Sequence, residues 1–182
     1  MDIPEHNNNI PQMFIFNGTS SSGKTTLAKA LLDRLDNSYT YLSLDNHIRS
    51  ALESYENHYP KIFENEKVFS VIIPNLVLTF HDIIHAFLIN DQKVIVDHVL
   101  QENEWKDDLL SKIKQYKVCK IGLHCSVEEL EKRERYREDR KIGLAAYQFN
   151  KVHENMKYDI ELNTEENNVE ECINEILNKS IK

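Results

Sequence analysis

Residues 18–25 constrain this chain more than any other part of its sequence. They read GTSSSGKT, which matches the pattern G-x-x-x-x-G-K-[ST] without a gap. The apolar run at residues 13–17 predicts a buried strand before the motif, and residues 26–32 have apolar positions at helical spacing after it. A loop between such a strand and such a helix points its backbone N–H groups inward, and their positive partial charges add to the positive end of the helix dipole. The motif, which we call the P-loop, therefore predicts a cradle for the phosphates of a nucleoside triphosphate.

Each part of the P-loop has an expected role. Lys24 is expected to reach the β- and γ-phosphates, and the Thr25 hydroxyl is expected to ligate Mg²⁺. The alternative is a Ser/Gly-rich turn that fits the pattern by coincidence, but the flanking strand and helix favour phosphate binding. The residues expected to contact the nucleotide here are Gly18, Thr19, Ser20, Ser21, Ser22, Gly23, Lys24, Thr25 and Thr26.

Length and composition predict one domain. A chain of 182 residues with 41% hydrophobic composition is the size of one compact unit with one sizeable core. Residues 1–12 contain two prolines and no periodicity, which predicts a flexible lead into a single domain over residues 13–182. This lead lacks the basic and apolar regions of a signal peptide, and no run of about 18 apolar residues predicts a membrane span. We therefore expect a cytoplasmic protein without a membrane partner.

Charge and cysteine content exclude other classes of function. The net charge of −8 argues against nucleic acid as the main partner, because phosphate backbones are bound through positive fields. The cysteines, Cys119, Cys125 and Cys172, are odd in number and lack C-x-x-C spacing. They predict buried free thiols rather than a disulfide framework or a zinc site. The oligomeric state is left open.

The rest of the chain alternates between strand and helix patterns. Besides residues 13–17, strands are expected at residues 39–44, 93–97, 118–125 and 158–162. Helices are expected at residues 24–35, 47–54, 75–89, 104–113, 127–138, 144–154 and 169–178. Pro74 is expected to precede the third helix or to kink it, and residues 55–66 are expected to form a surface excursion. Five strands that alternate with helices predict an α/β fold with a parallel sheet.

Two aspartates stand at the carboxyl ends of predicted strands, where ligands of a parallel sheet gather. Asp97 is expected to position Mg²⁺ directly or through water, and its alternative role is that of a strand-terminating turn residue. Asp45 ends the second predicted strand, and its alternative role is that of a helix N-cap. At the same sheet edge as the P-loop, the Asp45 carboxylate is placed to accept the proton of a hydroxyl group that attacks a γ-phosphate.

Five basic residues gather within nine positions, namely Arg133, Arg135, Arg137, Arg140 and Lys141. In isolation they would indicate a solvated helix with i,i+4 ion pairs, to which Glu131 and Glu134 would contribute. Beside a P-loop, arginines on a mobile lid are a common means of offsetting the charge of the transferred phosphoryl group. We expect Arg133, Arg137 and Arg140 to face the nucleotide and Arg135 to face solvent.

Two histidines and two aromatic residues on the third predicted helix are given structural roles. His81 and His85 have i,i+4 spacing but no third metal ligand downstream, so they are expected to be helix-surface histidines. Phe80 and Phe87 are expected in the core rather than in a stacking platform for bases.

Further motifs carry a resemblance to a known family. The pattern D-R-x-x-G-x-A-x-x-Q ends at Gln148, and Val152-His153 and Tyr158-Asp159 follow it. With the P-loop, Asp45 and Asp97, these motifs resemble the chloramphenicol phosphotransferase-like family of P-loop kinases over nearly the whole chain from Met13 onward. The resemblance implies a kinase-type three-layer sandwich with a five-stranded parallel sheet and an Arg-rich helical lid.

The resemblance also implies a chemistry. It implies ATP and Mg²⁺ and transfer of the γ-phosphoryl group to a small-molecule hydroxyl, as in chloramphenicol 3-O-phosphorylation. The general base of the family carries over to Asp45, and the lid arginines carry over to Arg133, Arg137 and Arg140. His98 stands where a second acid is expected, and residues 46–49 are more polar than the family's drug-binding segment, so the acceptor is left open.

Two other functions are weighed against this one. The first is a nucleoside or sugar-nucleotide kinase, and the second is a nucleotide-binding regulatory protein that transfers nothing. An aspartate at the position of Asp45 beside an intact P-loop favours transfer, because a switch protein needs no base for an acceptor. The choice between ATP and GTP is left open.

Overall fold

A computed structural model describes residues 10–35, 38–58, 66–136 and 143–181, and it contains one five-stranded sheet in the order β2-β3-β1-β4-β5. All neighbouring strands are parallel. The strands are β1 (Met13–Asn17), β2 (Thr40–Ser43), β3 (Val94–His98), β4 (Val118–His124) and β5 (Ile160–Asn163). The α/β fold and the parallel sheet expected from the sequence are confirmed.

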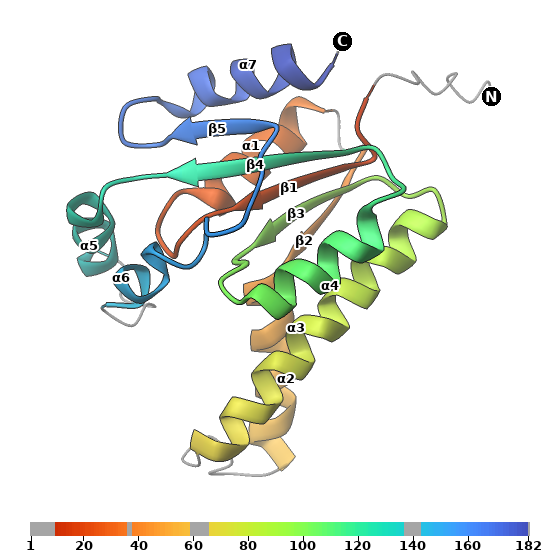
Figure 1. The fold of residues 1–182 in the computed structure, drawn as a ribbon, viewed down its shortest axis with the longest axis vertical. Helices are drawn as coiled ribbons and strands as arrows, with labels where there is room; N and C mark the ends of the chain where they lie inside the picture. The colour runs from red at the N-terminus through yellow and green to blue at the C-terminus, as the bar shows by residue number, and fades with distance from the viewer. Residues whose placement is uncertain (1–9, 36–37, 59–65, 137–142, 182) are drawn as a thin grey trace.

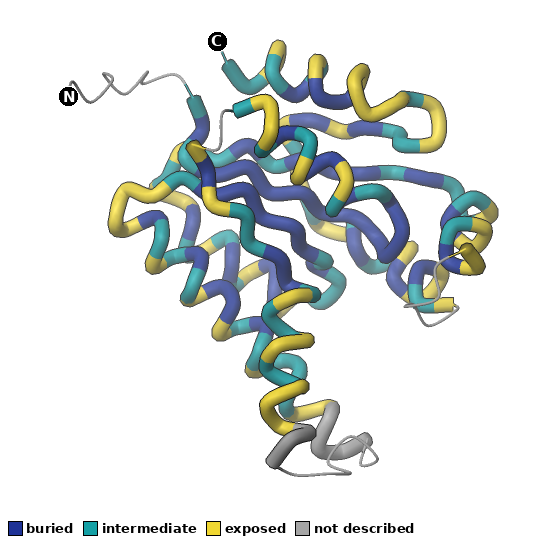
Figure 2. The backbone as a smooth tube through the Cα atoms, turned by 180° about the vertical axis from the view of Figure 1, so that it is seen from behind, coloured by how far each residue is buried: buried dark blue, intermediate teal, exposed yellow. Residues whose placement is uncertain are grey.

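Helices cover both faces of the sheet, with α3 and α4 on one face and α1 and α7 on the other (Figure 1). Successive residues of a strand point to opposite faces, so Phe14 and Phe16 pack in one core cluster while Met13 and Ile15 pack in the other. Figure 2 shows the central strands as almost entirely buried. The helices are α1 (Lys24–Arg34), α2 (Leu44–His58), α3 (Glu66–Ile89), α4 (Asn103–Ile113), α5 (Val127–Arg135), α6 (Leu144–Phe149) and α7 (Val169–Ser180).

Several expected helix boundaries are wrong. Helix α2 is longer at both ends than the expected residues 47–54, and α3 begins at Glu66 and contains Pro74. The bond that Pro74 cannot make would go to the carbonyl of Ser70, which is exposed, so water reaches the position of the lost bond. Of the expected excursion at 55–66, residues 59–65 lie outside the described residues. Helix α6 ends at Phe149, five residues earlier than expected. In the segment that follows, Asn155 has a positive φ angle of 58°, which a helix does not contain.

Other residues lie where the sequence places them. Phe80 is buried and Phe87 packs against the same core cluster. The cysteines Cys119, Cys125 and Cys172 are buried and unbridged.

In the part of the chain that the structure describes, one helix meets the length and composition of a membrane span, contrary to the expectation from sequence. This segment, Ser70–Ile89 of α3, has 20 residues and a mean hydropathy of 1.7. One face of it, with Val77, Phe80, Ile84 and Leu88, is buried against the sheet. Core helices of soluble proteins pass the same test, so this single helix is weak evidence for a span.

Asn17, the last residue of β1, joins the start of the P-loop to three other segments. Its Nδ2 donates to the Val152 carbonyl at 2.9 Å and to the Tyr158 hydroxyl at 2.7 Å, and its Oδ1 accepts from the Leu100 N–H at 2.8 Å. The side chain is buried, where an unmatched amide would be costly. These bonds therefore fix the place where β1 turns into the P-loop.

Tyr158 and His153 extend this network. A Cβ on Gly122 would lie 2.6 Å from the Tyr158 ring, so the ring packs where only glycine leaves room. Because the Tyr158 hydroxyl accepts from Asn17, its own proton is directed to His153 Nδ1, 2.8 Å away. Burial, followed by the nearby charge of His124, lowers the pKa of His153 to about 4, so the ring is neutral and able to accept.

This network predicts a stability that depends on pH. In the unfolded chain His153 binds a proton near its ordinary pKa of 6.5, whereas the folded imidazole stays neutral down to about pH 4. Between these two values the unfolded state binds more protons, so the free energy of unfolding falls as the pH falls. The His153→Gln variant keeps an acceptor for Tyr158 but cannot titrate. We expect its stability, measured by urea unfolding and circular dichroism, to fall less across this window than that of the wild type.

His85→Gln serves as the control for the loss of one histidine, because His85 lies on α3 outside this network. An identical loss of stability on acidification in the wild type and in His153→Gln would contradict the assignment.

Candidate active site

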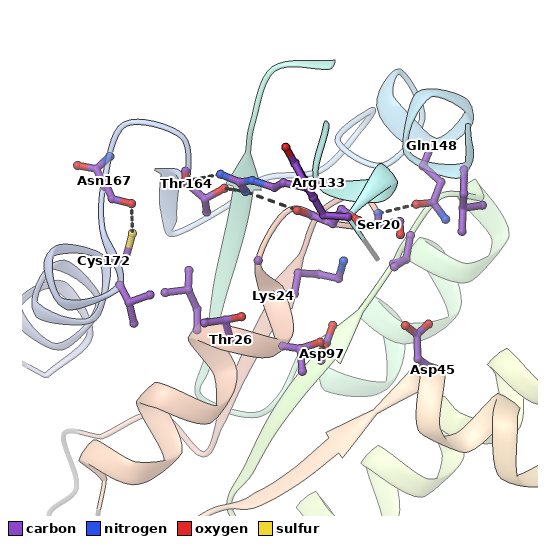
Figure 3. Close-up of a pocket in the computed structure, with 18 residues that line it drawn as sticks. Ser20, Lys24, Thr26, Asp45, Asp97, Arg133, Gln148, Thr164, Asn167 and Cys172 are labelled. Atoms are coloured by element: carbon purple, nitrogen blue, oxygen red, sulfur yellow. Dashed lines mark hydrogen bonds between the residues drawn. The ribbon is translucent and has the colours of Figure 1, made fainter. Parts of the chain in front are cut away.

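A cavity of about 550 Å³ opens at the carboxyl edge of the sheet (Figure 3). The parallel register brings the ends of β1, β2 and β3 together there, with Asn17 opposite His98 and Ser43 opposite Asp97. The cavity is of the size usual for small-molecule sites, about 300–1,000 Å³. The residues that line it are Ser20, Ser21, Gly23, Lys24, Thr25, Thr26, Leu27, Asp45, Asp97, Val99, Arg133, Tyr136, Leu144, Gln148, Thr164, Asn167, Val169 and Cys172.

Most of the site residues expected from the sequence line this one cavity. They are Ser20, Ser21, Gly23, Lys24, Thr25, Thr26, Asp45, Asp97 and Arg133. Gly18, Thr19 and Ser22 belong to the same loop but do not line the cavity. Arg137 and Arg140, and with them the expected lid, lie outside the described residues.

The P-loop has the backbone and the donors of an anion cradle. Ser21 and Gly23 have positive φ angles of 62° and 91°, and a Cβ on Gly18 would lie 2.9 Å from the Leu123 carbonyl. The hydroxyls of Ser20, Ser21 and Ser22 are buried and have no hydrogen-bond partner among the described residues. The first N–H groups of α1 also lack acceptors within the helix. Buried donors of this kind fit a ligand rich in oxygen acceptors, such as a triphosphate.

Lys24 lies folded over the P-loop. Its side chain is buried, and its Nζ donates to the Thr19 carbonyl at 2.6 Å. The ammonium group is therefore already held above the cradle that its own loop forms.

A hydroxyl and a carboxylate meet where a magnesium ion is expected. Thr25 Oγ1 donates to Asp97 Oδ2 at 2.6 Å, and the Tyr41 hydroxyl lies 3.1 Å from the same oxygen. Burial and the charge of Asp97 raise the pKa of Tyr41 to about 12, so Tyr41 remains a donor. Hard oxygen ligands suit Mg²⁺, and among the described residues no group of three or more His, Cys, Asp or Glu side chains is arranged to hold a metal ion by itself. A magnesium ion here would take its other ligands from phosphate and water.

Asp45 lies in the first turn of α2, because β2 ends at Ser43. Ser43 Oγ accepts from the Asn46 N–H at 3.4 Å, so Ser43 provides the capping oxygen that the sequence had offered as an alternative role for Asp45. In Figure 3 the Asp45 carboxylate is directed towards the cavity, on the side away from Asn167 and Cys172. Asp45 and the P-loop therefore line the same cavity.

Arg133 ties α5 to the rest of the site. Its guanidinium donates to the Thr164 hydroxyl at 3.1 Å and to the Thr164 carbonyl at 2.9 Å, and it pairs with Glu129 at 3.0 Å. It also lies 3.5 Å from the Ser21 carbonyl of the P-loop. Arg135 is exposed, as expected.

Glu134 was missed by the sequence reasoning, which placed it in an exposed charged stripe. The residue is buried and accepts from the N–H groups of Gly143 and Ala145 at 2.9 and 2.8 Å. Gly143 caps α6 with φ 92°. Glu134 thus holds the start of α6, a partnership that a pattern of alternating arginine and glutamate does not reveal.

Gln148 on α6 was also given no role of its own. Its Oε1 accepts from the Ser20 N–H of the P-loop at 2.7 Å, and the side chain is buried against the cavity. The only signal for it in the sequence was its place at the end of the D-R-x-x-G-x-A-x-x-Q pattern.

The expectation of a helix-surface position is wrong for His81. This residue is fully buried, with Nδ1 lying 2.7 Å from Asp108 and Nε2 lying 2.8 Å from His98 Nε2. Burial lowers the pKa of both histidines and keeps them neutral. The partners come from β3 and α4, so the spacing of histidines within α3 could not reveal them. His85 is half-buried beside Tyr116.

Comparison with known proteins gives a consistent result. A family model described as chloramphenicol phosphotransferase-like protein matches residues 11–180. Two Mycobacterium tuberculosis proteins, named "Putative O-phosphotransferase MT2714" and "Putative O-phosphotransferase Rv2636", are each 30% identical, over 91% of this chain and 80% of theirs.

Solved structures of kinases share the fold. A sugar kinase from Janibacter matches with a TM-score of 0.64 and 18% identity, over 91% of this chain and 92% of that one. The Mycobacterium tuberculosis APS kinase CysC matches with a TM-score of 0.63 and 15% identity, over 93% and 97%. A gluconokinase from Sinorhizobium meliloti has a TM-score of 0.61 and 18% identity, over 95% and 91%. At these identities the likeness concerns the fold, which is that of P-loop kinases.

The family match spans almost the whole chain, and the P-loop, Asp45 and Asp97 lie in the same cavity. This protein belongs to the chloramphenicol phosphotransferase-like family and is a kinase.

Proposed function

We propose that this kinase transfers the γ-phosphoryl group of ATP to a hydroxyl group of a small molecule, with Mg²⁺ as cofactor. The observation that carries the proposal is the shared cavity. It joins the P-loop, whose serine hydroxyls have no hydrogen-bond partner in the described part of the chain, to the Thr25–Asp97 pair and to the Asp45 carboxylate. We further propose that residues 13–182 form a single domain after the lead at 1–12, and that the protein is cytoplasmic.

The residues of the P-loop bind the phosphates in this proposal. The N–H groups at the start of α1, the hydroxyls of Ser20–22 and the ammonium group of Lys24 donate to phosphate oxygens. Thr25 Oγ1 and an Asp97 oxygen would hold the magnesium ion, which supplies positive charge to the phosphoryl oxygens when bound. Lys24 exchanges its bond to the Thr19 carbonyl for one to phosphate, so the positive charge remains at the site throughout.

Asp45 is the proposed general base. Its carboxylate accepts the proton of the acceptor hydroxyl as that oxygen attacks the γ-phosphorus, and the acceptor lies between Asp45 and the P-loop. Arg133, Arg137 and Arg140 are proposed to offset the charge of the phosphoryl group as the lid closes.

The identity of the acceptor is a separate question. The family description names chloramphenicol, and the structural neighbours include a sugar kinase and a gluconokinase. Polar and basic side chains follow Asp45 at Asn46, His47 and Arg49, so a metabolite with several polar groups is as suitable an acceptor as chloramphenicol. A nucleoside or sugar-nucleotide kinase is the nearest alternative, and a regulatory protein without transfer is the more distant one.

A panel of acceptors tests the function directly. The protein is incubated with ATP, Mg²⁺ and a mixture of chloramphenicol, nucleosides and sugars, and mass spectrometry identifies the compound that gains one phosphoryl group. We expect transfer by the wild type and its loss in Lys24→Ala, because removal of preorganised charge costs about 3 kcal/mol or more of the barrier. Normal turnover by a folded Lys24→Ala protein would disprove the assignment of the P-loop. Hydrolysis of ATP without any phosphorylated acceptor would favour the regulatory alternative.

The role of Asp45 is tested by Asp45→Asn, which keeps the shape of the side chain and removes the proton acceptor. We expect ATP affinity in calorimetry to change little and acceptor phosphorylation to fall by roughly two to four orders of magnitude. Asp33→Asn, on the exposed surface of α1, is the matched control. If ATP binding collapses while the rate per bound ATP stays normal, Asp45 has a structural role or binds the metal.

The lid is tested by comparing two arginines in steady-state kinetics. Arg140→Ala is expected to depress the maximal rate more than it weakens ATP binding, because its contact forms mainly in the transition state. Arg135→Ala is expected to have little effect, since an exposed i,i+4 pair contributes only about 0.3–0.5 kcal/mol. Small and equal effects of both changes would indicate a solvated helix without a catalytic role.

A further inference from the structure

Gln148 presents an amide group to the cavity in a fixed orientation. The Ser20 N–H is a donor, so the atom of Gln148 that lies 2.7 Å from it must be the carbonyl oxygen Oε1. The two hydrogens of Nε2 are then directed elsewhere, and none of the described residues accepts a hydrogen bond from them. A buried atom without a partner would be one of the orphaned polar atoms, and Nε2 is not one of them, so Nε2 is accessible. Because Gln148 lines the cavity, this donor faces the cavity space.

The Gln148 amide lies towards one end of the nucleotide site. In Figure 3 Gln148 and Asp45 lie on one side of the cavity, and Asn167 and Cys172 lie on the other, with Lys24 between them. Lys24 marks the β- and γ-phosphates in the proposed function. Gln148 therefore lies beside the acceptor end of the phosphate chain, where the terminal phosphoryl group is transferred.

The bond to Ser20 does not occupy the phosphate cradle. The N–H groups that a helix start offers to an anion are those of its first turn, which here begins at Lys24, and the Ser20 N–H precedes that turn. Gln148 can keep its bond to Ser20 while phosphates fill the cradle. Its Nε2 then adds one donor at the edge of the cradle that the loop itself does not supply.

Helix α6 is held at both ends, which fixes the amide in place. Glu134 binds the N–H groups of Gly143 and Ala145 at its start, and the Val152 carbonyl, just beyond its end, accepts from Asn17. The Gln148 carbonyl accepts from the Val152 N–H at 3.0 Å, which links these two anchors. A donor held in this way loses little conformational entropy when it binds a charged oxygen.

We propose that Gln148 is a contact for the γ-phosphate, with Oε1 bonded to the Ser20 N–H and Nε2 donating to a terminal phosphoryl oxygen at the acceptor side. The contact rests on the proposed use of ATP. The contact would strengthen the binding of ATP but not that of ADP, because the β-phosphate is bound by the first turn of α1 and not by α6.

Gln148→Glu separates this role from a structural one. The carboxylate still accepts from the Ser20 N–H, and more strongly because it is charged, but it has no donor for phosphate and repels it. With Mg²⁺ present, calorimetry measures the dissociation constants of a non-hydrolysable ATP analogue and of ADP. We expect the dissociation constant of the ATP analogue, divided by that of ADP, to rise by about tenfold or more, as the loss of a hydrogen bond to a charged group implies. Gln115→Glu, an exposed glutamine after α4, carries the same charge change and is expected to keep the wild-type ratio.

Gln148→Met is the second variant, in case the buried carboxylate prevents folding. It has no donor and no added charge, and it is expected to change the ratio in the same direction. An unchanged ratio in the folded variants, or an equal loss of both nucleotides, overturns the contact. If the wild type binds neither nucleotide, the proposed function falls as well. If the wild type binds the analogue and phosphorylates an acceptor while Gln148→Glu behaves like Gln115→Glu, the contact alone is wrong.

Discussion

The site depends on one buried asparagine. Asn17 ends the central strand, and its amide is matched by a carbonyl after α6, a hydroxyl before β5 and an N–H after β3. Each of these partners belongs to a segment that also borders the cavity or supports it. A buried amide that loses a partner carries a desolvation cost, so these three bonds favour the arrangement of the segments that the structure shows. The position of the P-loop relative to α6 follows from that arrangement.

The placement of several residues of the candidate site depends on local features, and these were predictable from the sequence. The P-loop is contiguous, and Asp97 lies near the carboxyl end of its strand, so a strand-loop pattern and the rule for parallel sheets were sufficient. Asp45 was predicted at the correct edge, although it starts a helix instead of ending a strand, because Ser43 terminates β2. The strands β1 and β3 were also predictable from local sequence, since they are buried on both faces and read as apolar runs.

The features that sequence could not give are partnerships between distant segments. Glu134 looks like one charge among many until Gly143 and Ala145 are placed beside it, and His81 looks like a surface residue until His98 and Asp108 complete its bonds. The long helix α3 passes through Pro74 because its packing against the sheet outweighs the cost of one lost bond at an exposed position. In each case the decisive interaction joins residues that no window of sequence contains together.

The contact between Gly122 and Tyr158 has a consequence for how relatives of this protein diverge. The ring lies where a side chain at position 122 would begin, and its hydroxyl belongs to the Asn17 network. A larger residue at position 122 is tolerated only if the aromatic ring is lost, and loss of the ring removes one partner of Asn17. The two positions are therefore expected to change together during evolution. In a relative that lacks the tyrosine, we expect another group to accept the hydrogen bond from the asparagine that corresponds to Asn17.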